Sequence, residues 1–333
     1  MKQISIYFLT LIFCINNALG NDNLDFENWK EKFRSVALAN NISEKTFNIT
    51  MSDVKFLPKV IEYDRFQPEF YEDTKTYISK RTSKNKVKKG LRFYSNENQL
   101  IHKVEKKYKI EKELLLALMG IETNYGTYVG KMDILSSLAT LSFDDRRSKF
   151  FTKELLILLR LIENNQIDYK TLYGSWAGAF GFFQFMPSTI KNYAIDFNKD
   201  NYIDLKNPSD AYASAGNYLK SIGWKQNAHC FYKINLNKDI SNKYLNVSAK
   251  KLVNKRKLKF FKKFITNYDD LSFIDENLNV AIITPDKDII PEAETLNPAY
   301  IVFDNYEIIL KWNRSLRFAL AVCTLKDKIK NEL

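Results

Sequence analysis

The stretch from Glu113 to Gly130, ELLLALMGIETNYGTYVG, limits most strongly what this chain can fold into. Glu122 follows Leu115 by seven residues and Leu118 by four, so a helix places its carboxyl on the leucine-lined face. The segment Asn124–Gly126 indicates that this helix ends just beyond the glutamate. Partial burial and the negative end of the helix dipole should both raise the pKa of such a carboxyl. Glu122 is therefore a candidate general acid, although a glutamate in the last turn of a helix is more often solvated.

A second unusual block follows at residues 174–196, GSWAGAFGFFQFMPSTIKNYAID. Glycines interrupt an aromatic-rich stretch, within which Gln184 and Met186 stand among phenylalanines. Small residues let a ligand approach the backbone, and aromatic rings with a few amides suit the apolar faces and hydroxyl edges of sugars. Taken alone, the same pattern would also suit core packing.

Helical periodicity dominates the rest of the chain up to Trp224. The periodicity predicts helices over 26–77, 99–121, 150–162 and 210–222, with a turn at 67–70 that interrupts the first range. The polar run Lys80–Gly90 is predicted to be a linker or an exposed loop. Beyond Trp224, short β-branched segments at 279–284 and 299–303 favour strands, and a helix is expected over 315–329. The expected fold class is mainly α (α+β), with a small strand-rich insertion before the last helix.

The chain is basic, with 51 Lys and Arg against 39 Asp and Glu and a net charge of +12. We expect the excess to be spread along the sequence, apart from the run Lys80–Lys89. Such a charge favours polyanionic partners, but no nucleic-acid-binding motif accompanies it, so nucleic acid is not an expected partner. A basic exterior also suits an anionic cell wall or a membrane face, and solubility explains any single lysine better than either.

The first twenty residues have the pattern of a secretory signal peptide. Lys2 precedes an apolar run, Ile4–Ile15, which is followed by the small residues Ala18 and Gly20. The run is too short for a permanent membrane-spanning helix. We therefore expect export to the periplasm and cleavage after Gly20. A lipid anchor at Cys14 is not expected, because bulky residues precede it.

Two cysteines, Cys230 and Cys323, remain after the signal peptide. They could form one bridge in an oxidising compartment. Their apolar neighbours equally suit two buried small side chains, and we favour the unbridged form.

The blocks IETNYG and GAFGFFQFMPS together resemble the catalytic core of lytic transglycosylases that have a lysozyme-like fold. Further stretches, in the same order, are similar to the B family of these enzymes: YDRFQPEF, LATLSFDDRRSKFF, DFNKDNYIDLKNPSDA, NYLKSIGW and NPAYIVFDNYEIILKWNRSLRFALAV. The similarity covers nearly the whole chain after residue 20 and is weakest over 225–278. We accordingly expect a signal peptide (1–20), an N-terminal helical subdomain (21–90), a lysozyme-like catalytic core (91–224), a small strand-rich subdomain (225–298) and a C-terminal strand and helix that return to the core (299–333).

The resemblance implies cleavage of the MurNAc-β-1,4-GlcNAc bond in peptidoglycan glycan strands. Glu122 would protonate the glycosidic oxygen and then act as base for the C6 hydroxyl of the same sugar, which closes onto C1 as a 1,6-anhydro end. An intramolecular nucleophile has a high effective concentration, so neither a second carboxylate nor a cofactor is required, unlike in most glycoside hydrolases. A lysozyme-type hydrolase and a non-catalytic peptidoglycan-binding protein remain alternatives.

The resemblance also implies which residues line the cleft. They are Ser175, Gln184, Met186, Tyr218, Trp312 and Asn313, with Arg146 and Arg147 as a nearby basic pair. Surface salt bridges would explain the two arginines equally well. Phe150, Trp312 and Phe318 stand where the family pattern has tyrosine, which preserves stacking and removes hydroxyl hydrogen bonds. A monomer is expected, and peripheral association with the membrane or with cell-wall synthesis proteins is left open.

Residues 196–210 are similar to a calcium-binding loop. The candidate ligands at positions 1, 3, 5, 7 and 9 of an EF-hand-like loop are Asp196, Asn198, Asp200, the carbonyl of Tyr202, and Asp204. Asn201 replaces the usual glycine, and Asn207 replaces the closing glutamate. The resemblance implies that Asp210 closes the loop instead. We expect a structural Ca²⁺ that contributes stability, with an ordinary Asx-rich turn as the alternative.

Overall fold

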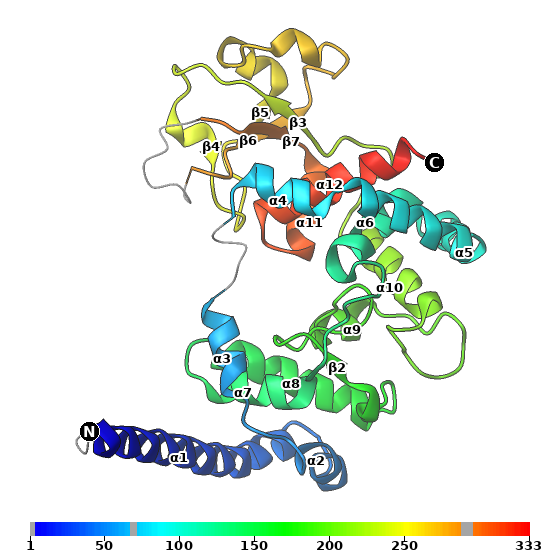
Figure 1. The fold of residues 1–333 in the computed structure, drawn as a ribbon. Coiled ribbons are helices and arrows are strands. Elements are labelled where there is room, and N and C mark those ends of the chain that lie inside the picture. Colours follow the sequence, from blue (N-terminus) through cyan, green and yellow to red (C-terminus); the bar gives the residue numbers. More distant parts are fainter. Residues whose placement is uncertain (1–3, 67–71, 288–295) are drawn as a thin grey trace. The chain divides into compact units, whose positions relative to one another are not determined.

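The structure is a computed structural model that describes residues 4–66, 72–287 and 296–333, with side chains from residue 22 onward (Figure 1). The predicted turn at 67–70 lies outside the described residues. The chain divides into two compact units. Unit 1 contains residues 1–66, 129–192 and 199–204, and unit 2 contains residues 67–128, 193–198 and 205–333. The predicted catalytic range 91–224 thus contributes to both units.

Unit 1 is built around a helical pair. Its helices are α1 (Ile4–Ala39), α2 (Glu44–Met51), α3 (Pro58–Arg65), α7 (Ile134–Phe143), α8 (Ser148–Glu163) and α9 (Pro187–Tyr193, whose last residue belongs to unit 2). Helices α7 and α8 pack against each other, and Phe26 of α1 contacts Phe143 edge-on with ring centroids 5.6 Å apart. Strand β1 (Met132–Asp133) pairs antiparallel with β2 (Tyr173–Gly174), which follows a short 3₁₀ turn at Tyr169–Thr171.

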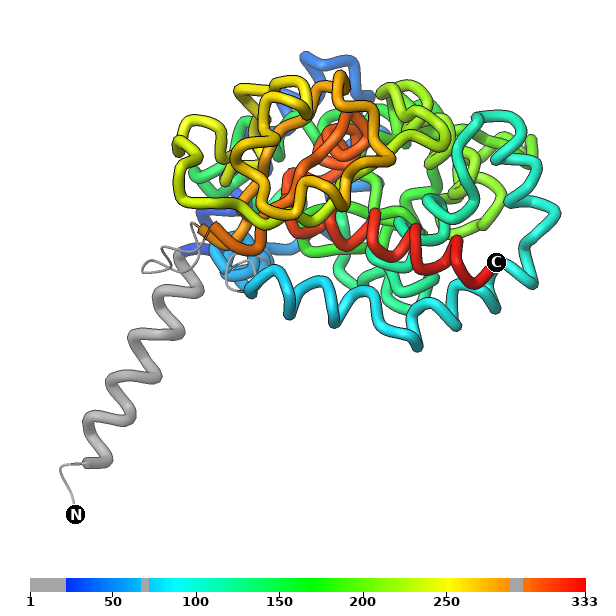
Figure 2. The backbone as a smooth tube through the Cα atoms, turned by 90° about the horizontal axis from the view of Figure 1, so that it is seen from above, coloured from blue at the N-terminus to red at the C-terminus, as the bar shows by residue number. Residues whose placement is uncertain are grey.

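Unit 2 carries the apolar helix predicted from the sequence. Its helices are α4 (Thr74–Arg81), α5 (Lys84–Tyr108), α6 (Lys112–Thr123), α10 (Pro208–Ser221), α11 (Asp304–Trp312) and α12 (Leu316–Lys330). The run Leu114–Met119 of α6 is fully buried, because α12 packs along it. Helix α12 also runs beside α4 and α5, as both views of the chain show (Figure 2).

A small sheet in unit 2 holds the strand-rich segment together. It consists of β3 (Phe231–Ile234), β4 (Leu245–Asn246), β5 (Arg256–Lys257), β6 (Asn279–Ile283) and β7 (Ala299–Val302). The order is β3-β7-β6-β4, with β5 also paired to β6. Strand β7 is antiparallel to both neighbours, so Ile301 lies opposite Tyr232 and Ile282. The sheet and the 3₁₀ turns at Asn242–Tyr244, Leu258–Phe264 and Tyr268–Leu271 enclose a separate apolar core.

The predicted fold class, mainly helical with a small sheet before the last helix, is confirmed. The prediction of a loop over Lys80–Gly90 is wrong, because α5 begins at Lys84. Ser83 caps this helix by accepting a hydrogen bond from the Lys86 N–H at 3.4 Å. Lysine is a good helix former, and Gly90 is buried where a Cβ atom would lie 2.9 Å from the Tyr125 ring. Polarity in this run therefore marks an exposed helix face.

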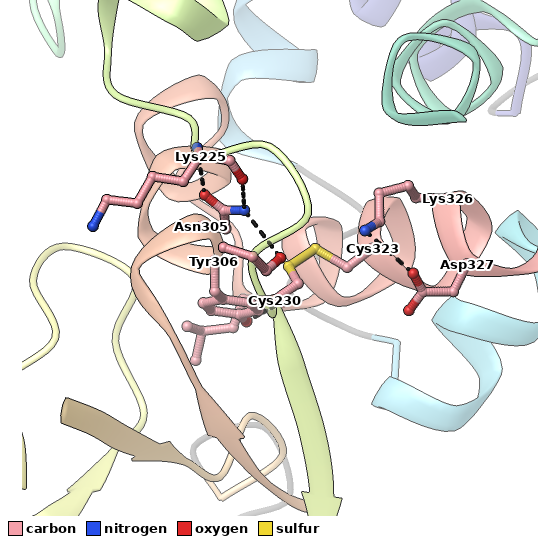
Figure 3. Close-up of a disulfide and its surroundings, with 9 residues drawn as sticks. Lys225, Cys230, Asn305, Tyr306, Cys323, Lys326 and Asp327 are labelled. Atoms are coloured by element: carbon pink, nitrogen blue, oxygen red, sulfur yellow. Dashed lines mark hydrogen bonds and ion pairs between the residues drawn. A yellow bond between two sulfur atoms is a disulfide. The ribbon is translucent and has the colours of Figure 1, made fainter. Parts of the chain in front are cut away.

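The favoured unbridged state of the two cysteines is also wrong. Cys230 and Cys323 form a disulfide with their Cα atoms 6.3 Å apart (Figure 3). Asn305 of α11 fixes the turn that leads to Cys230: its side chain accepts a hydrogen bond from the Lys225 N–H and donates to the carbonyls of Lys225 and Ala228. The pairing joins residues 93 apart in sequence, so no local pattern could reveal it.

None of the helices in the described part of the chain has both the length and the apolar character needed to cross a membrane.

Candidate active site

Glu122 lies in the last turn of α6, one residue before the helix ends. Asn124 adopts a left-handed conformation with φ +51°, and its N–H bonds back to the carbonyl of Gly120. The predicted helix end is thereby confirmed, and the glutamate side chain is half-buried as expected. Its Oε1 accepts a hydrogen bond from Nε1 of Trp312 at 2.9 Å. The carboxyl is thus held between helices α6 and α11.

The tryptophan that contacts Glu122 ends a column of stacked rings. Tyr218 of α10 stacks on Trp312 with centroids 5.0 Å apart, and Tyr193 stacks on the other side of Tyr218 at 4.4 Å. Tyr218 donates its hydroxyl proton to the Lys311 carbonyl at 3.2 Å. Burial, together with Tyr193, raises the pKa of Tyr218 to about 12, so this side chain is neutral at physiological pH. The column thus joins rings from α9, α10 and α11 next to the acid on α6.

Tyr193 was not predicted as a site residue, although it belongs to the 174–196 block. Asn217 of α10 holds its carbonyl through a side-chain hydrogen bond of 2.9 Å. An aromatic residue closing the amphipathic helix α9 was the signal that could have drawn attention to it. Asn313 directly follows α11 and is half-buried, with its backbone N–H bonded to the Ile309 carbonyl.

The remaining part of the IETNYG block is structural. Tyr125 has φ +60° and packs its ring over Gly90 and Gly120, where no Cβ atom could fit. Burial raises its pKa. Thr123 Oγ1 accepts the Gly126 N–H at 3.1 Å and so closes the turn after the acid. These residues fix the backbone that carries Glu122.

The second predicted block forms a tight loop in unit 1. Ser175 exchanges two hydrogen bonds with Ala179: its N–H donates to the Ala179 carbonyl at 2.8 Å, and its Oγ accepts the Ala179 N–H at 3.1 Å. Phe180 and Phe185 pair through reciprocal backbone bonds. Gln184, at φ +49°, lies in the turn between them and donates from Nε2 to the carbonyls of Gly181 (2.9 Å) and Val129 (3.2 Å). Met186 is half-buried and lies between Phe185 and the start of α9.

The basic pair has a structural partner. Asp64 of α3 is buried, and both Arg146 and Arg147 form ion pairs with its carboxylate. Arg146 also donates to the Asp64 carbonyl at 2.6 Å, and the Arg147 guanidinium lies 4.7 Å from the Phe151 ring centroid. Burial lowers the pKa of Arg147. The salt-bridge interpretation therefore accounts for both arginines.

The site residues fall on both units. Glu122, Tyr218, Trp312 and Asn313 belong to unit 2, and Arg146, Arg147, Ser175, Gln184 and Met186 belong to unit 1. Of the three aromatic departures from the family pattern, Trp312 contacts the acid, Phe150 is exposed, and Phe318 is buried in α12.

The candidate calcium loop has a backbone turn at the expected position. Asn201 adopts φ +73° at the position where glycine is usual. Asp200 Oδ1 accepts the Tyr202 N–H at 2.9 Å. Asp210 is fully buried and accepts the N–H groups of Phe197 (2.8 Å) and Asn198 (3.4 Å). Within the residues that the structure describes, no three His, Cys, Asp or Glu side chains converge as a metal site.

Comparison with known proteins gives a consistent result. Residues 25–327 match the family described as Transglycosylase SLT domain. The chain is 39% identical over 149 residues to the membrane-bound lytic murein transglycosylase B of Escherichia coli (strain K12). This alignment covers 44% of the chain and 41% of that relative, so it spans less than half of the relative's length.

Two solved structures show the same fold. SltB3 from Pseudomonas aeruginosa, in complex with NAG-anhNAM-pentapeptide, has a TM-score of 0.78 at 29% identity, covering 92% of this chain and 79% of that one. The Escherichia coli lytic transglycosylase Slt35, in complex with calcium, has a TM-score of 0.74 at 24% identity, covering 93% of this chain and 94% of the other.

Proposed function

Because the chain belongs to the Transglycosylase SLT domain family, we propose that it cleaves the MurNAc-β-1,4-GlcNAc bond of peptidoglycan and leaves 1,6-anhydro-MurNAc ends. The main supporting observation is the half-buried carboxyl of Glu122, held by the Trp312 N–H at the end of an apolar helix. SltB3, a structural relative, was solved with a peptidoglycan fragment bound, NAG-anhNAM-pentapeptide.

In the first step, the protonated carboxyl of Glu122 gives its proton to the glycosidic oxygen, and the bond from that oxygen to C1 of MurNAc breaks. The N-acetyl group of the same sugar stabilises the positive charge at C1. The carboxylate that forms on Glu122 keeps its hydrogen bond from Trp312, and a bond from N–H to an ionised acceptor is stronger than a neutral one. Trp312 thereby stabilises the base needed next.

In the second step, the C6 hydroxyl of MurNAc attacks C1, and its proton returns to Glu122. The nucleophile belongs to the sugar already bound, so its effective concentration is high and no water has to be positioned. Glu122 ends the cycle protonated, as it began. Only one carboxyl is needed, because Glu122 donates the proton in the first step and accepts one in the second.

Sugar binding is assigned to two groups of side chains. The column of Tyr193, Tyr218 and Trp312 offers ring faces to the apolar faces of sugars. Gln184 commits its Nε2 to backbone carbonyls, so its Oε1 is the acceptor for a sugar hydroxyl. Ser175, Met186 and Asn313 are proposed as further contacts. Arg146 and Arg147 are left out, because Asp64 engages both.

Digestion of purified murein, followed by mass spectrometry of the products, tests the assignment. Wild-type protein should give anhydro ends, and Glu122→Gln should reduce turnover by at least ~10²-fold without loss of the fold. Glu113→Gln is the matched control, since it removes another buried glutamate from the same helix.

The alternatives give different products. Reducing ends would identify a hydrolase of the lysozyme type, and binding without cleavage by the wild-type chain would identify a wall-binding protein. Near-normal turnover in Glu122→Gln would rule out the role of this carboxyl.

We also propose export to the periplasm by the signal at residues 1–20, since murein lies in that compartment. Mass spectrometry of the exported protein should find Asn21 as the first residue. An uncleaved N-terminus, or a lipid on Cys14, would contradict this.

A structural Ca²⁺ in the loop 196–210 is a separate proposal. The ligand set of Asp196, Asn198, Asp200, the Tyr202 carbonyl and Asp210 consists of hard oxygens, which Ca²⁺ prefers, and the φ of +73° at Asn201 supports the required turn. Added Ca²⁺ should raise the melting temperature of the chelator-treated protein, and Asp200→Asn should weaken this effect. A melting temperature that Ca²⁺ leaves unchanged would refute the proposal.

A further inference from the structure

One segment of the strand-rich part carries a large share of the positive charge of the chain. Residues 243–263 contain nine Lys and Arg and no Asp or Glu: Lys243, Lys250, Lys251, Lys255, Arg256, Lys257, Lys259, Lys262 and Lys263. These nine charges leave +3 for the rest of the +12 chain. The prediction that the excess is spread along the chain apart from the run Lys80–Lys89 is therefore wrong, because it missed this second cluster. The segment lies in the strand-rich part of unit 2, where the family resemblance is weakest.

Part of this segment gathers its cations around three aromatic rings, of which Phe260 is exposed, Tyr244 is half-buried and Phe264 is buried. The Lys243 ammonium lies 5.0 Å and the Arg256 guanidinium 6.0 Å from the centroid of the Tyr244 ring. The centroid of the Phe260 ring lies 5.3 Å from that of Tyr244 and 6.2 Å from that of Phe264. The Lys263 ammonium lies 4.9 Å from Phe264. We define the basic aromatic patch as Lys243, Tyr244, Arg256, Phe260, Lys263 and Phe264.

The patch stands on ordered structure. Asn246 closes the preceding loop by accepting the Val253 N–H at 2.7 Å and donating to the Val253 carbonyl at 3.2 Å. Phe261, next to Phe260, is fully buried in the apolar core of the strand-rich segment. The cations of the patch are therefore displayed by a fixed surface and do not belong to a flexible tail.

The charges of the patch are available to a ligand. Within the described residues, neither Lys243, Arg256 nor Lys263 forms an ion pair, whereas Lys255 is paired with Glu307 at 2.8 Å. The Phe260 side chain of the patch is 37% exposed. Asp269, Asp270 and Glu276, the acidic residues that follow in the sequence, form no ion pair with these three cations within the described part of the chain.

We propose that the basic aromatic patch binds the surface of an anionic phospholipid membrane. Each Lys or Arg held near such a surface strengthens partitioning by about fivefold at moderate salt. An apolar ring among the cations adds burial at the boundary between headgroups and acyl chains. An anionic polymer without apolar faces would use the cations but gain nothing from the exposed Phe260, so the ring favours a lipid surface over such a polymer. Murein, whose sugars have apolar faces, is distinguished by the binding test below.

Sedimentation with vesicles tests the proposal. Protein purified after export, so that every variant has the same N-terminus, is mixed with vesicles of phosphatidylglycerol and phosphatidylcholine or of phosphatidylcholine alone. Binding should require phosphatidylglycerol and should be lost in about 1 M salt, where the Debye length is about 3 Å. The triple variant Lys243→Gln, Arg256→Gln and Lys263→Gln should bind about 100-fold more weakly.

The matched control removes three exposed lysines from α5 of the same unit, as Lys88→Gln, Lys103→Gln and Lys106→Gln. This control should retain most of the binding. Phe260→Ala should weaken vesicle binding several-fold and leave binding to purified murein unchanged. Equal loss in both triple variants, binding to phosphatidylcholine alone, or a patch that affects murein binding but not vesicle binding would overturn the proposal. Glu122→Gln should bind vesicles normally. A failure of the proposed catalysis can therefore be distinguished from a failure of the membrane-binding proposal.

Discussion

The two regions that carry the predicted site residues are built by different means. Glu122 is positioned by side chains on helices: its partner Trp312 and the stacked Tyr218 come from two other helices of the same unit. Gln184 is positioned by backbone, in a turn where the glutamine itself and two neighbouring glycines, Gly178 and Gly181, have positive φ. The acid thus depends on helix packing, whereas the loop depends on close approach of main chain.

This difference suits the two tasks. A proton donor must stay within hydrogen-bonding reach of one atom, and helices hold side chains more precisely than loops do. A loop that must follow a sugar surface needs small residues that let the ligand come near its backbone. The contrast predicts that replacing glycines lowers the stability of the loop region. It also predicts that removing hydrogen-bonding groups lowers kcat at the acid.

The largest effect is expected for Gly130→Ala, which would break the loop region. Gly130 has φ +86°, and a Cβ atom there would overlap the carbonyl of Gly174 at the start of the loop. Strain and overlap together should lower the free energy of unfolding by about 4 kcal/mol. Gly223→Ala is the control, because at φ +100° its Cβ would meet only Ile308 at 3.6 Å, so the loss should be about 1–2 kcal/mol. Equal losses in chemical denaturation would show that backbone proximity is unimportant.

A smaller loss of stability is expected when the disulfide between Cys230 and Cys323 is removed. The disulfide anchors α12, which packs on α6, to the start of β3. Replacing Cys230 and Cys323 by alanine should lower the free energy of unfolding by about 3 kcal/mol. Turnover at temperatures where the protein stays folded should be unchanged, since the contacts of Glu122 come from other side chains. Reduction of the wild type should give the same shift; if it leaves the unfolding midpoint unmoved, the bridge does not contribute.

The smallest effect concerns the hydrogen bond at the acid. Trp312→Phe keeps a ring for Tyr218 and removes the N–H that Glu122 accepts. Loss of a bond to a charged group should reduce kcat by about 10-fold, or ~1.4 kcal/mol. Tyr218→Phe keeps the stacked ring and removes the bond from its hydroxyl to the Lys311 carbonyl, so kcat should change by less than about 3-fold. If both variants behaved alike, stacking would matter more than the tryptophan N–H.

Local sequence patterns predicted several helices and the position of the candidate acid. The leucine spacing before Glu122 and the turn signal at Asn124 predicted both the half-buried side chain and the helix end. The Lys80–Gly90 segment misled, because lysines on an exposed helix face resemble a polar linker until the burial of Gly90 under Tyr125 is known. The stacking of Tyr193 on Tyr218 was missed, because the two rings come from separate helices.

The sequence by itself determined the helical framework, the place of the candidate acid and the family resemblance, because these depend on spacing along one element. The tertiary structure decided the Cys230–Cys323 bridge, the ring column beside Glu122, the pairing of both arginines with Asp64 and the clustering of cations around Tyr244. These features join residues on different elements. Their formation depends on how the chain packs, and residue order alone does not specify that.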